Sequence, residues 1–512
     1  MRLIRKSLIL IHRYLGIVLS LLFTVWFLSG IGMIYSRGMP SLSPESRLLR
    51  APAIDLAQLR LTPIEAAAQL TQSGAPRVGR VVVGTMLGRP IYRLGGRGGS
   101  SMVFADDGSV LDGVDADMAK RIASHFLNVP EERLHQTLID EPDQWTIGER
   151  QSLPLHKITV DDDARTELYI SAESGDIPVL TTRGSRALAW VSAIPHWLYF
   201  TSLRNQQRLW RQVVLWTSGA GCVLALLGII LGFTQFKWSR PLKLSRISSH
   251  IPYSGLMRWH YIAGVVFGVL TLTWVFSGLL SMEPWDWTSA PGLQGNLRGL
   301  LAGGAVNAEE FPRIDAAAWK KLLPGRAIKE IEYTKIQGEP YFAVRTNAAG
   351  SSEPDRVIIA AKTLEIRTAP FSVESLMSRV KQAYPNAPVL EFKLLTGYDS
   401  YYYSNDADRP LPVLRVKFDD PSKTWMYIDP RMSQVLGSLP RVRRLERWIY
   451  HGFHSLDFSF WYGNRPLWQS GMIVLNLGGA ALSLLGAYLG FKRVVRGAIW
   501  GGGQTKKPGS DG

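Results

Sequence analysis

Residues 12–30 read HRYLGIVLSLLFTVWFLSG, and residues 260–278 read HYIAGVVFGVLTLTWVFSG. Both stretches open on H-x-x-x-G, end on W-x-x-S-G and lie 248 positions apart. Each continues an apolar run of the length that a membrane-spanning helix needs, about 20 residues. The two stretches therefore predict an internally duplicated membrane protein.

Four windows of the chain carry no charged residue and are long enough to cross a bilayer. They are residues 14–35, 212–236, 259–282 and 466–491. A buried core helix of a soluble protein is the alternative for any one window, but it would have to recur four times. A cleaved signal peptide is the alternative for the first, yet its apolar run is too long and no A-x-A site follows. We therefore expect an α-helical membrane protein with four spans, the first of them uncleaved.

Basic residues indicate the orientation of the spans. Residues 1–13, 237–258 and 492–512 together hold 14 lysines and arginines and one acid, Asp511. Short basic loops stay in the cytoplasm, so both termini and this loop are expected there. Residues 36–211 and 283–465 are then expected outside. The net charge of +16 is explained by this topology, and a nucleic-acid partner is not expected.

The second half of each repeat aligns at a different shift, 258 positions, without a gap from residue 153 to 233. Leu153-Pro154 falls on Leu411-Pro412, Trp190 on Trp448 and His196 on His454. The repeated unit is helix, outside domain, helix, used twice in the same orientation. A parallel repeat of this kind predicts a pseudo-twofold axis along the membrane normal.

The outside regions have the pattern of α+β domains. Helical periodicity covers residues 63–72, 116–126 and 372–384, and alternating strand-like runs separated by turns fill much of the rest. Each region reads as two small helix-plus-hairpin units that should pack on one another, because a lone hairpin is marginal in water. Two Trp-rich segments, residues 187–200 and 441–456, are predicted to be interfacial helices ahead of the second and fourth spans.

Two histidines lie in the spans at matching repeat positions. His12 with Gly16, and His260 with Gly264, share a helix face at spacing i, i+4. Such a face suits a large flat ligand, since the imidazole reaches a metal while the glycine leaves room for a macrocycle. Close helix packing is the alternative meaning of each glycine. The duplication favours ligation, because ionisable groups inside spans are costly and usually functional.

A second histidine group is expected at the outer face. His196 and His454 are repeat equivalents, and His451 shares a helix face with His454 at i, i+3. A membrane-interface belt of Trp and His is the alternative. The repeat favours His196 with His454 as the ligand pair, and His451 competes with His454.

One haem cannot reach both groups across about 30 Å of hydrocarbon, so two b-type haems with bis-His ligation are the economical prediction. Cys222 is the single cysteine, which excludes a Cys₄ cluster and a c-type haem. Zinc is less favoured, because no Cys or carboxylate accompanies these histidines at ligand spacing.

The H-x-x-x-G and W-x-x-S-G spans, with outside D-D-G-S-V-L-type hairpins, resemble the PepSY-associated transmembrane helix family over about residues 8–495. The resemblance implies a bacterial inner-membrane location and PepSY-like domains in the periplasm. Four-span members with two such halves are similar to dihaem ferric-siderophore reductases of the FoxB type. The family's transmembrane histidines match His12 and His260, and the outer ligands carry over less directly.

We therefore expect electrons to pass from the inner haem to the outer haem and on to a ferric siderophore in the periplasm. No protein nucleophile or general base is evident, so no catalytic side chain is assigned. No dinucleotide fingerprint follows a strand, so quinol or a cytoplasmic reductase is expected as the donor. Two alternatives remain at this stage: a non-enzymatic PepSY protein regulating periplasmic peptidases, and a siderophore-uptake subunit without redox activity.

Overall fold

A computed structural model describes residues 2–501 apart from 37, 71–78, 97–98, 239–249, 349–354 and 405–408. Parts of the expected basic loop (237–258) and tail (492–512) lie outside the described residues. The chain divides into two compact units. The membrane unit comprises residues 1–39, 187–289 and 442–512, and the sheet unit comprises residues 40–186 and 290–441.

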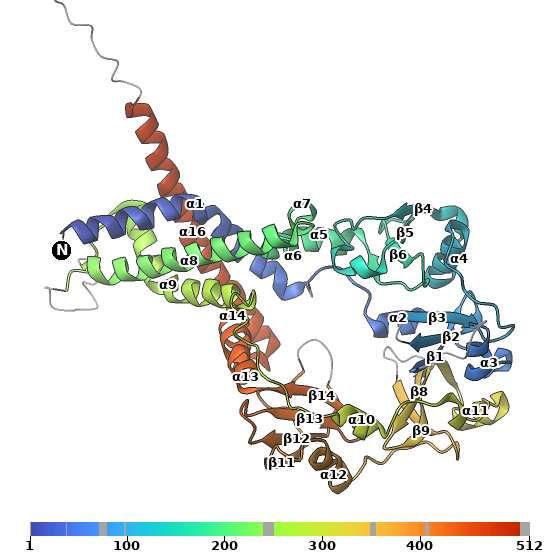
Figure 1. Ribbon diagram of the computed structural model, residues 1–512. Helices are drawn as coiled ribbons and strands as arrows, with labels where there is room; N and C mark the ends of the chain where they lie inside the picture. The colour runs from blue at the N-terminus through green and yellow to red at the C-terminus, as the bar shows by residue number, and fades with distance from the viewer. Residues whose placement is uncertain are drawn as a thin grey trace, which may run out of the picture. The chain divides into compact units, whose positions relative to one another are not determined.

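Four long helices form the membrane unit (Figure 1): α1 (Arg2–Tyr35), α8 (Gln207–Gln235), α9 (Gly255–Ser281) and α16 (Arg465–Gly501). Each is long and apolar enough to cross a membrane, which confirms the four predicted spans. α1 packs on α8 and α16, and α9 packs on the same two helices. Exchanging α1 with α9 and α8 with α16 leaves this pattern unchanged, as a duplicated bundle requires.

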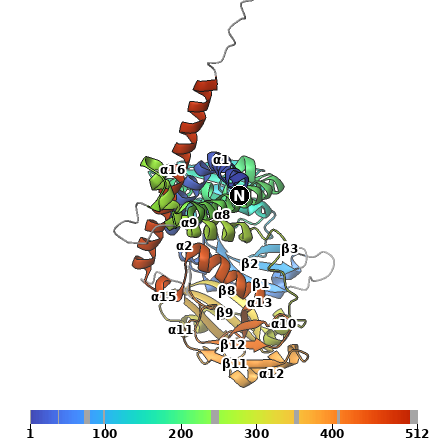
Figure 2. The same ribbon diagram turned by 90° about the vertical axis from the view of Figure 1, so that its left-hand side faces the viewer.

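Large side chains fill the centre of the bundle, which Figure 2 views from the end that carries the N-terminus. Phe23 and Phe27 of α1 meet Trp274 and Val275 of α9 in one buried cluster. Glycines admit these rings, since a Cβ at Gly221 would lie 2.8 Å from Phe23 and one at Gly479 would lie 2.6 Å from Phe27. The small residues of α8 and α16 therefore serve close helix packing at these positions.

Short helices precede α8 and α16. The segment expected as one helix over 187–200 is instead α5 (Arg183–Val191) and α6 (Ala193–Trp197), broken at Ser192, with α7 (Thr201–Arg204) after it. Residues 441–456 form α13 (Arg441–Arg447), a π-helical turn (Trp448–Gly452) and α14 (Phe453–Ser455), followed by α15 (Ser459–Tyr462). The break at Ser192 lies against α1, where a Cβ at Gly32 would be 2.8 Å from the Ser192 Cβ.

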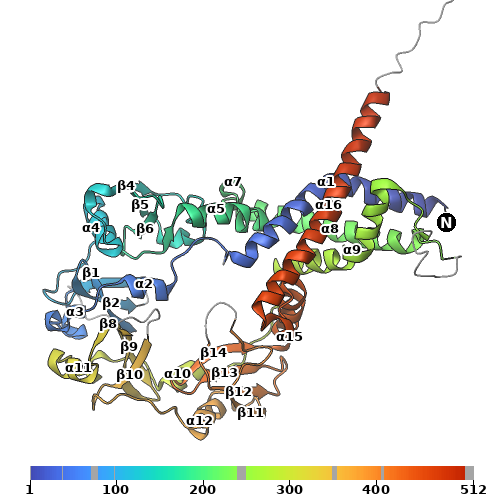
Figure 3. The same cartoon turned by 180° about the vertical axis from the view of Figure 1, so that it is seen from behind.

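The sheet unit is centred on a six-stranded antiparallel sheet in the order β10-β9-β8-β1-β2-β3, part of which can be followed from behind in Figure 3. Its strands are β1 (Arg80–Met86), β2 (Arg89–Gly96), β3 (Gly99–Phe104), β8 (Arg326–Ile336), β9 (Glu339–Ala348) and β10 (Asp355–Ala360). β1 pairs with β8, with Val82 opposite Glu332. One three-stranded meander from each half of the chain is thus joined at the middle of the sheet.

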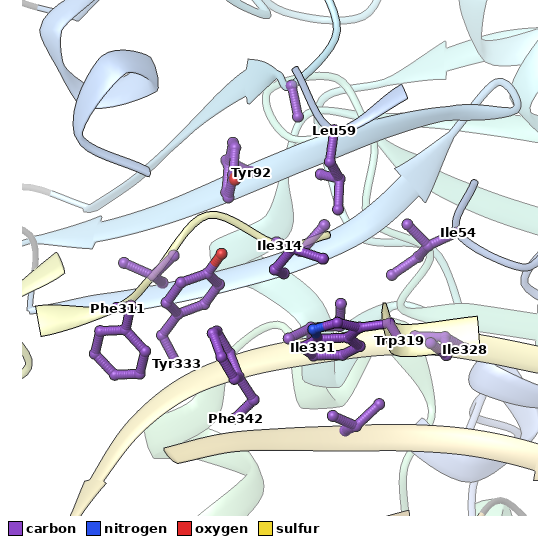
Figure 4. Close-up of a cluster of buried hydrophobic side chains, with 14 of the residues drawn as sticks. Ile54, Leu59, Tyr92, Phe311, Ile314, Trp319, Ile328, Ile331, Tyr333 and Phe342 are labelled. Atoms are coloured by element: carbon purple, nitrogen blue, oxygen red, sulfur yellow. The ribbon is translucent and has the colours of Figure 1, made fainter. Parts of the chain in front are cut away.

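One face of this sheet carries the largest core, shown in Figure 4. Trp319 from α11 (Ala316–Leu322) packs edge-on against Phe342 of β9, and Tyr333 of β8 contacts the same ring. Tyr92 and Leu94 come from the first half of the chain and Tyr333 and Phe342 from the second, so both halves share this core. The packing expected between the two units of one region is seen in the cluster that joins Ile91 and Phe104 to Ile122 and Ile158. The shared sheet instead joins one unit from each region, which the sequence did not predict.

Two four-stranded sheets complete the unit, one from each half. They are β4 (Leu134–Ile139), β5 (Leu155–Val160), β6 (Glu167–Ser171) and β7 (Val179–Thr181), and β11 (Val389–Leu395), β12 (Val413–Phe418), β13 (Trp425–Asp429) and β14 (Gln434–Leu439). α4 (Ala116–Leu127) covers the first and α12 (Val373–Ala383) the second. The Tyr169 hydroxyl donates to Asp143 (2.6 Å) and the Tyr427 hydroxyl to Asp399 (3.1 Å), so the two sheets repeat a polar contact as well as a fold.

Candidate functional site

The structure brings His196 and His454 together. His196 is on α6 and His454 on α14, and their ring centres are 6.1 Å apart. These two helices are far apart in the sequence and belong to different halves of the chain. Their approach is the pairing that the repeat predicted, and it defines the outer pair.

The W-x-x-S-G ending of α1 holds His196. The Nδ1–H of His196 lies 3.2 Å from the carbonyl oxygen of Trp26 and 3.1 Å from the Ser29 hydroxyl. The Ser29 hydroxyl itself donates to the Trp26 carbonyl. A Cβ at Gly30 would be 3.7 Å from the His196 Cε1, so the glycine brings the helix close to the ring. Three residues of one motif therefore position one imidazole.

The second copy of the motif holds His454 in the same way. The Nδ1 of His454 lies 3.2 Å from the Trp274 carbonyl oxygen and 3.0 Å from the Ser277 hydroxyl, and a Cβ at Gly278 would be 3.7 Å from the His454 Cε1. With Nδ1 committed as a donor, Nε2 is the nitrogen left as the acceptor in each ring. A hydrogen bond from the far nitrogen is the usual support of a histidine that binds a metal.

His12 and His260 form the inner pair, with ring centres 6.5 Å apart. The Nδ1 of His12 lies 3.1 Å from the Leu224 carbonyl on α8. His260 faces the equivalent Leu482 carbonyl on α16, but its buried Nδ1 completes no hydrogen bond within the described part of the chain. Of the two inner imidazoles, only that of His12 is hydrogen-bonded at Nδ1 within the described residues, and its acceptor is a helix carbonyl.

Glycines of the second and fourth spans contact the inner pair. A Cβ at Gly228 would lie 3.0 Å from the His12 Cε1, and one at Gly486 would lie 3.3 Å from the His260 Cε1. A Cβ at Gly16 would meet a Leu224 methyl group and the Ser20 hydroxyl, both at 3.9 Å, and one at Gly264 would meet a Leu482 methyl group at 3.8 Å. A methyl group would therefore fit in ordinary van der Waals contact at both positions, and their role as a cofactor face stays a prediction.

The spacing of both pairs fits shared metal ligation. Two imidazoles that bind one metal through nitrogens about 2 Å from it hold their ring centres roughly 6.5 Å apart. Within the described residues, no third His, Cys, Asp or Glu completes a metal cluster. Each pair supplies two ligands, so a metal there needs its other ligands from elsewhere, as the nitrogens of a porphyrin provide. The residues present fit a haem with two histidine ligands.

A cavity of about 450 Å³ opens at the outer pair. Its walls are mostly apolar and aromatic and include Trp26, Trp210, Trp274 and Trp468. Cofactor sites have this size and character. Trp26 and Trp274 line the cavity at repeat-related positions, and the indole N–H group of each is buried and unpaired among the described residues.

The outer imidazoles are neutral in this setting. Desolvation lowers the pKa of His196 to about 4, and the neighbouring His454 adds to the effect. Desolvation likewise lowers the pKa of His454 to about 4, despite its hydrogen bond to the Trp274 carbonyl. Metals bind the neutral form of imidazole, so both rings are in the ligating state well below pH 7.

His451, the competing ligand, is placed differently. It lies on the π-helical turn with its ring against Tyr450, while Tyr450 stacks on His454 with ring centres 5.1 Å apart. Among the described residues it is His454, and not His451, whose ring pairs with that of His196. A buried ion pair between Arg447 and Asp457, at 2.8 Å, brackets this turn. Ala189 and Tyr199 occupy the equivalent positions in the first half, so the sequence repeat gave no sign of the pair.

The structure also shows contacts that sequence reasoning did not assign. Ser29, Ser277, Gly228 and Gly486 all touch ligand-candidate imidazoles. Ser29 and Ser277 belong to the duplicated W-x-x-S-G motif, so their recurrence in the sequence could have marked them as functional. The two glycines lie in spans with many small residues, so nothing in the sequence distinguished them from packing glycines.

The sequence matches the model of the family described as PepSY-associated TM region over residues 9–383. A search among curated proteins finds no match. The matched segment covers most of the chain, including α1, α8, α9 and both strands that join the halves of the central sheet. The chain therefore belongs to the PepSY-associated TM region family.

Proposed function

We propose that this membrane protein binds two b-type haems and passes electrons across the bacterial inner membrane to a ferric siderophore in the periplasm. The observation that carries the proposal is the presence of two histidine pairs at metal-sharing distance, 6.5 and 6.1 Å between ring centres. Ser29, which contacts the outer pair, lies 17 residues after His12 of the inner pair on one continuous helix. At 1.5 Å per residue this separation is about 26 Å, close to the hydrocarbon thickness.

The chain's own residues perform the positioning. The carbonyl of Trp26 and the hydroxyl of Ser29, like those of Trp274 and Ser277, accept hydrogen bonds from Nδ1–H of the outer imidazoles. This would leave Nε2 of each ring free to bind a metal. A haem held by His196 and His454, or by His12 and His260, would supply reversible one-electron transfer without binding the substrate. The mostly apolar and aromatic walls of the outer cavity suit a cofactor with this electron-transfer role.

The proposed reaction needs no acid, base or nucleophile. One electron leaves a quinol or a cytoplasmic reductase, and one electron reduces Fe(III) in the chelate to Fe(II). Hard oxygen donors hold Fe(III) far more tightly than Fe(II), so reduction releases the iron. The expected orientation, with both termini in the cytoplasm, places the outer pair on the side where the chelate arrives.

A single-turnover experiment tests this function. The purified protein is reduced with dithionite, freed of excess reductant and mixed with a ferric trihydroxamate under anaerobic conditions. We expect the reduced haem absorbance to disappear while a ferrous chelator captures one Fe(II) for each electron stored. A reduced protein that keeps its spectrum and yields no Fe(II) would contradict the reductase function.

A further inference from the structure

A second cavity, of about 620 Å³, lies in the sheet unit at the β10 edge of the central sheet. Its lining comes from the end of α11, the start of β8, β10, the segment after β10 and the turn between β13 and β14. These elements all belong to the second half of the chain. The cavity is separate from the histidine pairs, which lie in the membrane unit.

Four arginines line this cavity, each from a different segment: Arg326, Arg356, Arg367 and Arg431. Asp355 is the one acidic residue among the described lining residues. Asp355 pairs with Arg326 at 2.7 Å and leaves the other three without an acidic partner in the lining. The cavity therefore carries an excess of positive charge.

The geometry of Arg356 and Arg367 shows donors left over. The Nε of each is buried and has no hydrogen-bond partner in the described part of the chain. Arg367 lies over the ring of Phe371 at 3.8 Å, which fixes the plane of its guanidinium. Arg356 approaches Glu332 at only 4.0 Å. Buried donors without partners cost free energy, so the fold retains this cost beside the cavity, where an anion would offset the positive charge of both guanidinium groups.

Burial of Arg356 also favours the binding of an anion, because it penalises the uncompensated positive charge. Burial and the neighbouring Arg345 lower the pKa of Arg356, while Glu332, Asp429 and Glu330 raise it less. An incoming anion would offset this penalty, since a charge-assisted hydrogen bond to a carboxylate is among the stronger polar contacts.

The arginines are not a requirement of the repeated fold. β3 is the equivalent edge strand of the first half, and its sequence, GSSMVF, contains no arginine. The arginine cluster is therefore particular to the second half of the chain.

We propose that this cavity binds a small polycarboxylate ligand through Arg356, Arg367 and Arg431. Planar guanidinium groups match carboxylates in bidentate geometry, and a 620 Å³ cavity is large for an inorganic ion but suits a ligand with several carboxylate arms. Resting on the proposed function, the ligand class is a ferric chelate with carboxylate groups, captured by the sheet unit.

Calorimetry on the full chain in zwitterionic nanodiscs tests the proposal without any reductant. The titrants are ferric citrate, citrate, inorganic phosphate and a neutral ferric trihydroxamate. We expect both citrate forms to bind, with an affinity that falls as salt is raised, and phosphate to bind at least about tenfold more weakly. Equal binding of phosphate would overturn the polycarboxylate assignment, and no binding of citrate at millimolar concentration would overturn the site.

Matched variants locate the site. Arg356→Gln with Arg367→Gln should weaken citrate binding at least about tenfold, and the exposed Arg431→Gln alone should weaken it severalfold. Arg121→Gln, on the exposed face of α4, should leave binding unchanged. Binding that survives both cavity variants contradicts the proposal. Haem absorbance recorded on the same samples separates this failure from a failure of the electron-transfer function.

Discussion

The outer and inner histidine pairs have similar ring spacing but different support. Each outer imidazole has two hydrogen-bond acceptors at Nδ1, a tryptophan carbonyl and a serine hydroxyl. In the inner pair, His12 has one carbonyl acceptor and His260 completes no such bond among the described residues. The outer rings are thus held in one orientation by the protein, whereas the inner rings depend more on what they bind. Each prediction below tests this difference.

The largest effect is expected from removing a ligand. His12→Ala should weaken haem binding at the inner site and His454→Ala at the outer site, each lowering the haem content of the purified chain from two toward one, because each haem would lose one of its two protein ligands. Haem per chain, measured by absorbance of the pyridine complex, checks both. His451→Ala is the control, and a loss of haem in that variant would place the outer ligand on His451 instead.

The serines should matter at the outer pair alone. Ser29→Ala or Ser277→Ala removes one of two Nδ1 acceptors and should lower haem affinity at the outer site by about 10- to 100-fold, as second-shell changes do. Titration of haem into the apoprotein measures this, together with the reduction potential of each site. A uniform effect on both sites would show that the serines act on the bundle as a whole.

Two glycine substitutions should show which helix surface a haem at the inner pair would contact. Gly228→Ala places a methyl group 3.0 Å from the His12 ring and should weaken the inner haem by about tenfold or less, since the ring has room to shift. Gly264→Ala meets only a leucine methyl at 3.8 Å and serves as the matched control for packing. If Gly264→Ala alone excludes haem while Gly228→Ala is tolerated, the macrocycle lies on the face that the sequence predicted.

A smaller effect is expected from changing Tyr450, which contacts His454 but has no aromatic equivalent beside His196. Tyr450 stacks on His454, and Ser192 takes the equivalent place near His196. Tyr450→Leu keeps an apolar neighbour but removes the ring, so we expect a shift of the outer reduction potential with haem content unchanged. Potentiometric titration of the two sites measures it, and a shift confined to the inner site would contradict this placement.

The duplicated motifs made the four spans and the histidine pairing accessible from sequence. His12 alone does not predict a ligand site, but its repeat equivalent His260 predicts a pair related by a symmetry axis. The sequence does not reveal which residues of neighbouring spans contact each other at a given depth in the membrane. The roles of Gly228 and Gly486 depend on which turn of α8 and α16 meets His12 and His260, and periodicity does not contain that register.

The central sheet shows the same limit. Several strands were predicted from alternation, but β8 was not, although it pairs with β1 and joins the two halves. Charged residues such as Glu330 and Glu332 alternate with its buried positions and lie on the face away from the main core. Pairing between residues some 250 positions apart is a tertiary fact, and local propensity carries no information about it. The break of the interfacial helix at Ser192 is likewise set by contact with α1.

The most direct test of the account counts haems in the unaltered protein. Protein purified from haem-replete cells should contain two haems per chain, and both should give the low-spin electron paramagnetic resonance signals of iron with two imidazole ligands. A colourless protein, or one with a single haem held by residues other than these four histidines, would contradict the account.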